Sequence, residues 1–171
     1  MTQDPLTLYK LIVLYMLNRV SFPMTKAQIG DFILEHEYTN FLTLQQVISE
    51  LIDANMITAQ SIRNRTHLSI TGDGKDTLDF FKNRISPAII QEIDSYFQEN
   101  EMEMRNEVSI LSDYYKLANG EYEAHLVAKD KDVNLVEIKM SVPFEEGAVS
   151  ICEHWEKKNQ DIYKYLVEQL F

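Results

Sequence analysis

The chain has 171 residues, of which 45% are hydrophobic, and it contains only five glycines and four prolines. This composition is typical of a globular protein of one large or two small domains, and it argues against a disordered or fibrous chain. The formal net charge of −11 is uneven: residues 1–86 hold 8 Lys and Arg against 9 Asp and Glu, and residues 87–171 hold 8 against 18. Because the first half is nearly neutral, it remains compatible with nucleic-acid binding, whose affinity comes largely from phosphate contacts.

The sequence also indicates where the protein acts. No apolar run is long enough to span a membrane, and Asp4 precedes the first apolar stretch, where a signal peptide would be basic. The single cysteine, Cys152, excludes an internal disulfide and fits a reducing compartment. We therefore expect a cytoplasmic protein with no membrane partner.

Three helices are predicted in the first part of the chain, over residues 5–20, 25–36 and 43–55. Asp4 and Thr25 are the candidate N-caps of the first two. The third has apolar residues at spacing i, i+3, i+4, i+7 and i+8, which is one stripe of an amphipathic helix: Leu44, Val47, Ile48, Leu51 and Ile52. Thr43 is its predicted N-cap, and Gln46 three residues later would complete a capping box.

After these helices the pattern changes to that of a β-hairpin. Residues 56–64 and 65–70 are rich in β-forming side chains, and they meet at the polar, turn-prone run Arg63-Asn64-Arg65. Leu68 and Ile70 alternate toward the interior, which sets the register of the second strand. Helices followed by a hairpin with a basic tip are the order of a winged helix-turn-helix.

Two resemblances support this interpretation. Residues 68–78, LSITGDGKDTL, resemble the strand-to-helix junction of PadR- and MarR-type winged-helix regulators. Over its whole length the chain resembles a clostridial family described as a domain of unknown function, through residues 38–46, 105–107, 113–115 and 151–155. That family is regarded as winged-helix-like, with no assigned catalytic residues or ligand. The resemblance therefore implies a fold rather than an activity.

A short helix over 75–84 is followed by a longer one that begins at Pro87 and links the two halves of the chain. Its apolar stripe contains Ile89, Ile90, Ile93, Tyr96 and Phe97. In many winged-helix regulators a helix at this point carries the dimer contact. The stripe fits equally well a helix that merely covers one of the domains, and the sequence leaves both interpretations open.

The second half reads as three antiparallel strands and a long helix. Alternating patterns predict strands over 107–117, 121–130 and 133–142, and a helical stripe runs over 145–170. Asn119-Gly120 predicts a type I′ turn between the first two strands. The predicted fold is thus α+β: a winged-helix domain at 1–86, a linking helix at 87–105 and a βββα domain at 106–171.

Catalytic and metal motifs are not evident in the sequence. The histidines are isolated from one another, and Cys152 and His154 point in different directions on a helix, so neither a zinc site nor another cofactor is expected. There is no Gly-x-Ser-x-Gly and no P-loop, and the glycines of Thr71-Gly72-Asp73-Gly74 serve a strand-to-helix turn. An enzyme is therefore not expected.

Nucleic acid is the favoured ligand. In a winged helix the 43–55 helix would enter the major groove, where Gln side chains pair with adenine, and the wing would grip the minor groove or phosphates. The candidate DNA-binding residues are Thr43, Gln45, Gln46, Ser49, Arg63, Asn64, Arg65 and His67. Against this, the 43–55 helix has no Lys or Arg, and Glu50 and Asp53 would repel phosphate.

We therefore expect a homodimeric regulator that binds double-stranded DNA. Its C-terminal domain would serve assembly or sensing, with a small molecule or a protein as effector. The alternative is a non-enzymatic adaptor that uses the winged helix for protein contacts. The acidic second half and the absence of basic side chains from the 43–55 helix favour this alternative.

Overall fold

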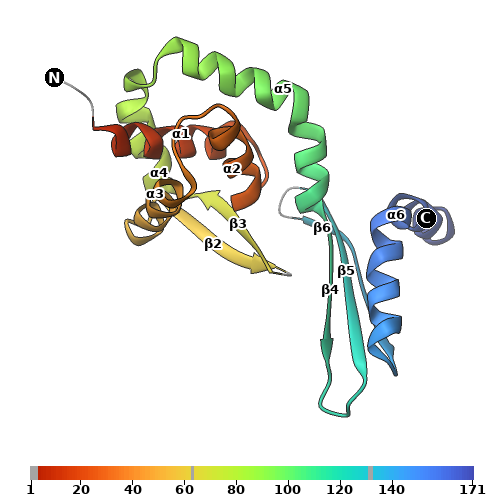
Figure 1. Ribbon diagram of the computed structural model, residues 1–171. Helices are drawn as coiled ribbons and strands as arrows, with labels where there is room; N and C mark the ends of the chain where they lie inside the picture. Colours follow the sequence, from red (N-terminus) through yellow and green to blue (C-terminus); the bar gives the residue numbers. More distant parts are fainter. Residues whose placement is uncertain (1–3, 63, 131–132) are drawn as a thin grey trace. The chain divides into compact units, whose positions relative to one another are not determined.

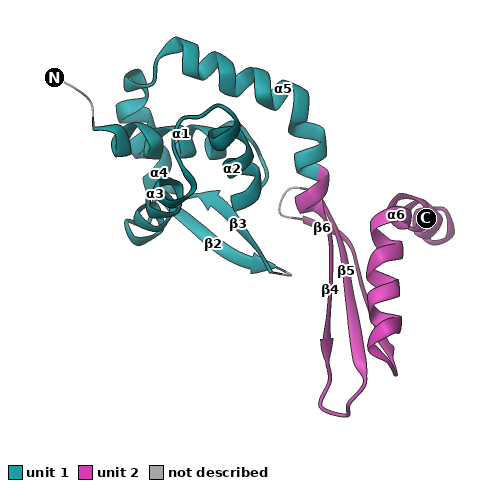
Figure 2. Cartoon of the chain, viewed as in Figure 1, with its two compact units in different colours: residues 1–105 teal, residues 106–171 magenta. Residues whose placement is uncertain are grey.

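The computed structural model describes residues 4–62, 64–130 and 133–171. The chain forms two compact units, Met1–Arg105 and Asn106–Phe171, which are coloured separately in Figure 2. The predicted α+β class is confirmed: helices and a small three-stranded sheet come first, and a second three-stranded sheet and a long C-terminal helix follow (Figure 1).

The first unit has the element order of a winged helix-turn-helix. Its elements are α1 (Pro5–Arg19), β1 (Met24–Thr25), α2 (Lys26–Glu35), α3 (Phe41–Asp53), β2 (Ile57–Ile62), β3 (Arg65–Ile70), α4 (Gly72–Phe81), a 3-10 turn (Lys82–Arg84) and α5 (Pro87–Ser109). The β2–β3 hairpin is antiparallel. Strand β1 pairs with β3 on the side away from β2, which gives the strand order β1-β3-β2. The two-residue β1 was not predicted, because so short a strand has no periodicity of its own.

Helix caps set where the first three helices begin. Asp4 and Thr25 are confirmed as N-caps, and Thr25 also forms a capping box with Gln28. The prediction that Thr43 caps the third helix is wrong. Helix α3 begins two residues earlier, because the side chain of Asn40 accepts a hydrogen bond from the Thr43 N–H at 2.9 Å.

This cap leads to a first prediction. Replacing Asn40 with alanine leaves the Thr43 N–H without its acceptor, and we expect it to lower the free energy of unfolding by about 1 kcal/mol. Thr43→Ala removes a side chain that is not the cap and is the matched control, with an expected change of less than about 0.5 kcal/mol. Urea denaturation monitored by circular dichroism measures both values. A larger loss for Thr43→Ala would assign the cap to Thr43 after all.

The apolar stripe of α5 packs on the winged helix within the first unit. Ile93 and Phe97 are fully buried, and Met104 is nearly so. Asp94 accepts hydrogen bonds from the Tyr15 hydroxyl at 3.1 Å and from Arg19 Nε at 3.3 Å, both of which belong to α1. Part of the stripe therefore covers the first unit, as one of the two interpretations has it, and a dimer contact through α5 stays a prediction. Helix α5 also continues to Ser109, past the predicted start of the next strand at Glu107.

The second unit is a meander of three antiparallel strands with one helix. Its elements are β4 (Ile110–Lys116), β5 (Tyr122–Asp130), β6 (Val133–Val142) and α6 (Glu145–Leu170), and the strand order is β4-β5-β6. The bounds of β6 and α6 agree with the prediction. Strand β4 begins later than predicted, because residues 101–109 are mostly good helix formers and extend α5.

The turn between β4 and β5 is not the predicted type I′. A type I′ turn needs positive φ at both central residues, but here only Gly120 has it, at 87°. The Gly120 N–H donates to the Leu117 carbonyl at 3.0 Å, and the Leu117 N–H donates to the Glu121 carbonyl at 2.7 Å. This is a three-residue loop, with the pattern of a type I turn followed by a glycine bulge.

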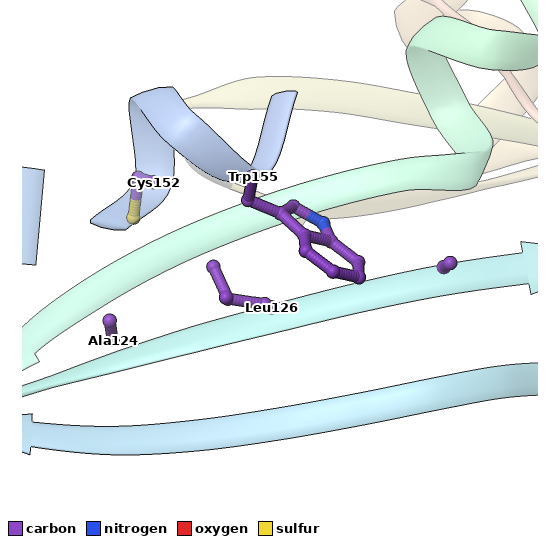
Figure 3. Packing of buried hydrophobic residues seen from close by; sticks show 5 residues of the cluster. Ala124, Leu126, Cys152 and Trp155 are labelled. Carbon is purple, nitrogen blue, oxygen red and sulfur yellow. The ribbon is translucent and has the colours of Figure 1, made fainter. Parts of the chain in front are cut away.

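The core of the second unit lies between β5 and α6 (Figure 3). It consists of Ala124, Leu126, Ala128, Cys152 and Trp155. The indole N–H of Trp155 donates to the Val127 carbonyl at 3.3 Å, which fixes the ring against the strand. Cys152 is a small buried residue of this core, as the helical stripe predicted.

Candidate nucleic-acid interface

Helix α3 has a buried apolar face and a polar outer face. Of the predicted stripe, Leu44, Val47, Ile48 and Leu51 are buried and Ile52 is half-buried. On the polar face, Gln46 and Ser49 are exposed. Thr43 and Gln45 are half-buried, and the amide oxygen of Gln45 accepts a hydrogen bond from Lys26 Nζ at 3.5 Å. Lys26 belongs to the first turn of α2. The packing of α2 and α3 therefore places one cation beside the polar face of α3 that is predicted to contact DNA bases.

The acidic residue Glu50 on α3 is paired inside the unit. Its carboxylate binds Lys10 of α1 at 2.5 Å and accepts a hydrogen bond from the Gln46 amide at 3.0 Å. These two hydrogen bonds, that of Lys10 above all, hold the pKa of Glu50 below its usual value. The repulsion of phosphate expected from Glu50 is therefore offset by a neighbouring cation, whereas Asp53 remains exposed at the end of the helix.

The tip of the β2–β3 hairpin is polar and basic. Asn64 and Arg65 are exposed, and Asn64 has a φ of 62°, a left-handed conformation that Asn tolerates better than most residues. Arg63, the other candidate at this turn, lies outside the described residues. An exposed guanidinium at the tip of a hairpin has the reach that a phosphate contact needs.

His67 does not belong to this surface. It lies in β3, the central strand of the sheet, opposite Thr25 of β1 and Gln60 of β2, and its side chain is only 4% exposed. His67 was predicted to contact DNA beside the wing tip, but the unpredicted strand β1 pairs with β3 at this point. The burial of His67 removes it from the set of residues available to a ligand.

Two exposed residues were missed. Phe41 and Leu42 open the first turn of α3 and are 59% and 79% exposed. Predicting the helix from Thr43 left both of them in the preceding loop. Asn40 was the signal that could have found them, since Asn is a preferred N-cap and its position puts Phe41 and Leu42 on the helix.

The first unit also has a hollow whose lining is acidic. It is an open groove of about 1140 Å³ between α2 and α5, and its lining includes the carboxylates Asp31, Glu35, Glu92 and Glu99. The Tyr38 hydroxyl donates to Glu92, and burial together with this bond raises the pKa of Tyr38. A groove lined with carboxylates repels a phosphate backbone, so the polar face of α3 and the hairpin tip remain the nucleic-acid candidate.

A family model described as "Domain of unknown function (DUF4364)" matches residues 9–170. The chain belongs to the DUF4364 family. Because the match spans both compact units, the family comprises the first unit and the βββα unit together. Neither the curated proteins nor the solved structures give a significant match to this chain.

Within this DUF4364 protein, two further features bear on the candidate site. Among the described residues, no three His, Cys, Asp or Glu side chains are grouped so that they could hold a metal ion. In the same part of the chain, no helix is both long and apolar enough to cross a membrane. The candidate residues that are exposed, Gln46 and Ser49 on α3 and Asn64 and Arg65 at the hairpin tip, carry amides, a hydroxyl and a guanidinium, and such groups bind by hydrogen bonding and charge.

Proposed function

We propose that this DUF4364 protein binds double-stranded DNA through α3 and the β2–β3 wing and regulates transcription, with the second unit serving assembly or sensing. The observation that carries the proposal is the outer face of α3, where Gln46 and Ser49 are exposed and Glu50 is paired with Lys10. A glutamine amide can make two hydrogen bonds to an adenine edge in the major groove. The resemblance of residues 68–78 to PadR- and MarR-type regulators also supports it.

The wing supplies the second element of the proposal. Arg65 at the exposed hairpin tip would contact a phosphate or enter the minor groove, and Asn64 beside it would add a hydrogen bond. Such contacts position a protein on the duplex without reading its sequence. Sequence preference would then come from α3, and affinity from Arg65 together with Lys26.

Salt-dependent binding tests this proposal. We expect the wild-type protein to bind mixed duplex DNA at low salt, measured by fluorescence anisotropy. We expect Arg65→Ala to weaken binding about 5–10-fold and to reduce the slope of log K against log salt by about 0.9, the contribution of one phosphate contact. Lys82→Ala, at an exposed residue of the 3-10 turn, changes the charge equally and is the control that should leave binding unchanged. Binding that does not depend on salt, or that Arg65→Ala leaves intact, contradicts the proposal.

The apolar start of α3 favours a second candidate function. Phe41 and Leu42 are large and exposed, and such side chains are common at protein interfaces. An adaptor that binds a protein through this end of α3 would use the same helix. Absence of DNA binding at low salt, together with a co-purifying protein that Leu42→Asp releases, would favour the adaptor over the regulator.

A further inference from the structure

The apolar stripe of α6 continues beyond the sheet that covers its first half. Ala148, Cys152 and Trp155 are buried at spacings of four and three residues. The same spacing continues through Asn159, Ile162 and Leu166, with Leu170 one turn further along the same side. The burial of the stripe decreases toward the C-terminus of α6: Ile162 and Leu166 are half-buried, and Leu170 is 75% exposed.

The hydrogen bond from Trp155 shows where the sheet ends along α6. It reaches Val127 of β5, and β5 continues for only three more residues, to Asp130. Three strand residues extend about 10 Å, a distance that a helix covers in about seven residues. Ile162 is therefore the last residue that the strand can support, in agreement with its contact with the core cluster. We call residues 163–171 the α6 overhang.

The overhang presents apolar side chains on one side. Tyr163, Leu166, Val167 and Leu170 follow one another at helical spacing, and they are half-buried or exposed. At the same end of the sheet, Val133 and Leu135 at the start of β6 are also exposed, at 63% and 47%. This end of the second unit therefore carries more apolar surface than isolated exposed residues would.

Charge indicates what can cover this surface. Residues 106–171 hold 7 Lys and Arg against 13 Asp and Glu, so two copies of the unit repel each other over most of their surface. The side chains of the overhang sum to no net charge, because it holds one lysine, Lys164, and one glutamate, Glu168, whose charged atoms lie 3.9 Å apart. Both lie on the side of the helix away from the apolar residues. Two overhangs can therefore meet without placing like charges together.

We propose that two copies of this chain associate through their α6 overhangs, which cross as a pair of helices about a twofold axis. A twofold contact uses the same patch on both partners, and this patch is apolar and neutral on each. Helix α5 is not the contact in this arrangement, because Ile93 and Phe97 of its stripe are buried within the first unit, where the helix also bonds to α1 and α2. This proposal does not rest on DNA binding.

The mass in solution tests the proposal without any DNA. We expect the wild-type protein at micromolar concentration to sediment as a dimer of about 40 kDa, twice the 20.0 kDa chain. Leu166→Glu with Leu170→Glu adds two negative charges to the apolar side and should give the monomer mass. Lys164→Glu changes the net charge by the same amount on the other side of the helix, and it should leave the dimer intact.

Leu170→Glu alone separates a loss of self-association from a loss of folding, because this side chain is already 75% exposed and its replacement should not disturb the fold. It should weaken self-association at least about tenfold, because an unpaired carboxylate would be buried in the contact. The fluorescence of Trp155, the only tryptophan, reports that the second unit is still folded in each variant. A monomeric wild type, a dimeric double variant, or a Lys164→Glu variant that is also monomeric would each overturn the proposal.

Discussion

Replacing Gly74 with alanine is expected to lower the free energy of unfolding of the first unit by about 3 kcal/mol or more. A Cβ at this position would lie 2.1 Å from the carbonyl oxygen of Met56 and 2.8 Å from Cγ1 of Ile70. The first of these atoms is backbone and cannot turn aside. Either the start of α4 or the Asn55-Met56 turn must move to make room.

Neighbouring hydrogen bonds make that movement costly. The Thr71 N–H donates to the Met56 carbonyl at 3.0 Å, and the Thr71 hydroxyl donates to the Asn55 carbonyl at 2.7 Å. The same hydroxyl accepts from the Gly74 N–H at 3.0 Å, as the N-cap of α4. A shift at Gly74 therefore strains the cap and the turn together.

Gly72→Ala is the matched control for this prediction. Gly72 also lies in the first turn of α4, but a Cβ there meets no atom within 4 Å. Alanine should leave stability unchanged or raise it by up to about 1 kcal/mol, since it restricts the unfolded chain. Thermal and urea denaturation measure both variants, and equal effects of the two substitutions would show that Gly74 is not packed as described.

Replacing Trp155 with alanine is expected to cost the second unit about 3–5 kcal/mol. The indole is 1% exposed and is the largest side chain of the cluster in Figure 3, so its removal leaves a cavity between α6 and β5. It also removes the indole N–H that donates to the Val127 carbonyl at 3.3 Å. The free energy of unfolding of so small a unit is expected to be no larger than this loss, so the variant unit should be largely unfolded.

Hydrogen exchange measured by mass spectrometry locates this effect along the chain. Protection should be lost in peptides from residues 110–170, and Tyr165→Ala on the same helix is the control. Tyr165 is 62% exposed, so its loss should change stability by less than about 0.5 kcal/mol. Full protection of β5 in Trp155→Ala would refute the placement of this ring in the core.

Local patterns predicted most of the elements. The stripe of α3 identified its buried face, and the alternation in residues 133–142 and the stripe in 145–170 gave the bounds of β6 and α6. These patterns are reliable because each element buries one face, and the spacing of its apolar residues records that face directly. The exposure of Gln46 and Ser49 followed from the same reasoning.

Contacts between distant residues account for what was missed. Strand β1 exists because Met24 and Thr25 pair with Leu68 and His67, more than forty residues away in the chain. That pairing makes β3 a central strand and helps to bury His67. Likewise, nothing near Glu50 in the sequence indicates that Lys10 binds it, since only the packing of α1 on α3 brings the two together.

The sequence by itself determined the class of fold, the order of its elements and the polar residues of α3, because these depend on periodicity and on caps within a few residues. The tertiary structure alone decided that Thr43 and Gln45 are half-buried, what the apolar stripe of α5 packs against and where along α6 the cover of the sheet ends. Those properties depend on which elements pack together, and packing joins side chains whose separation along the chain leaves no local pattern.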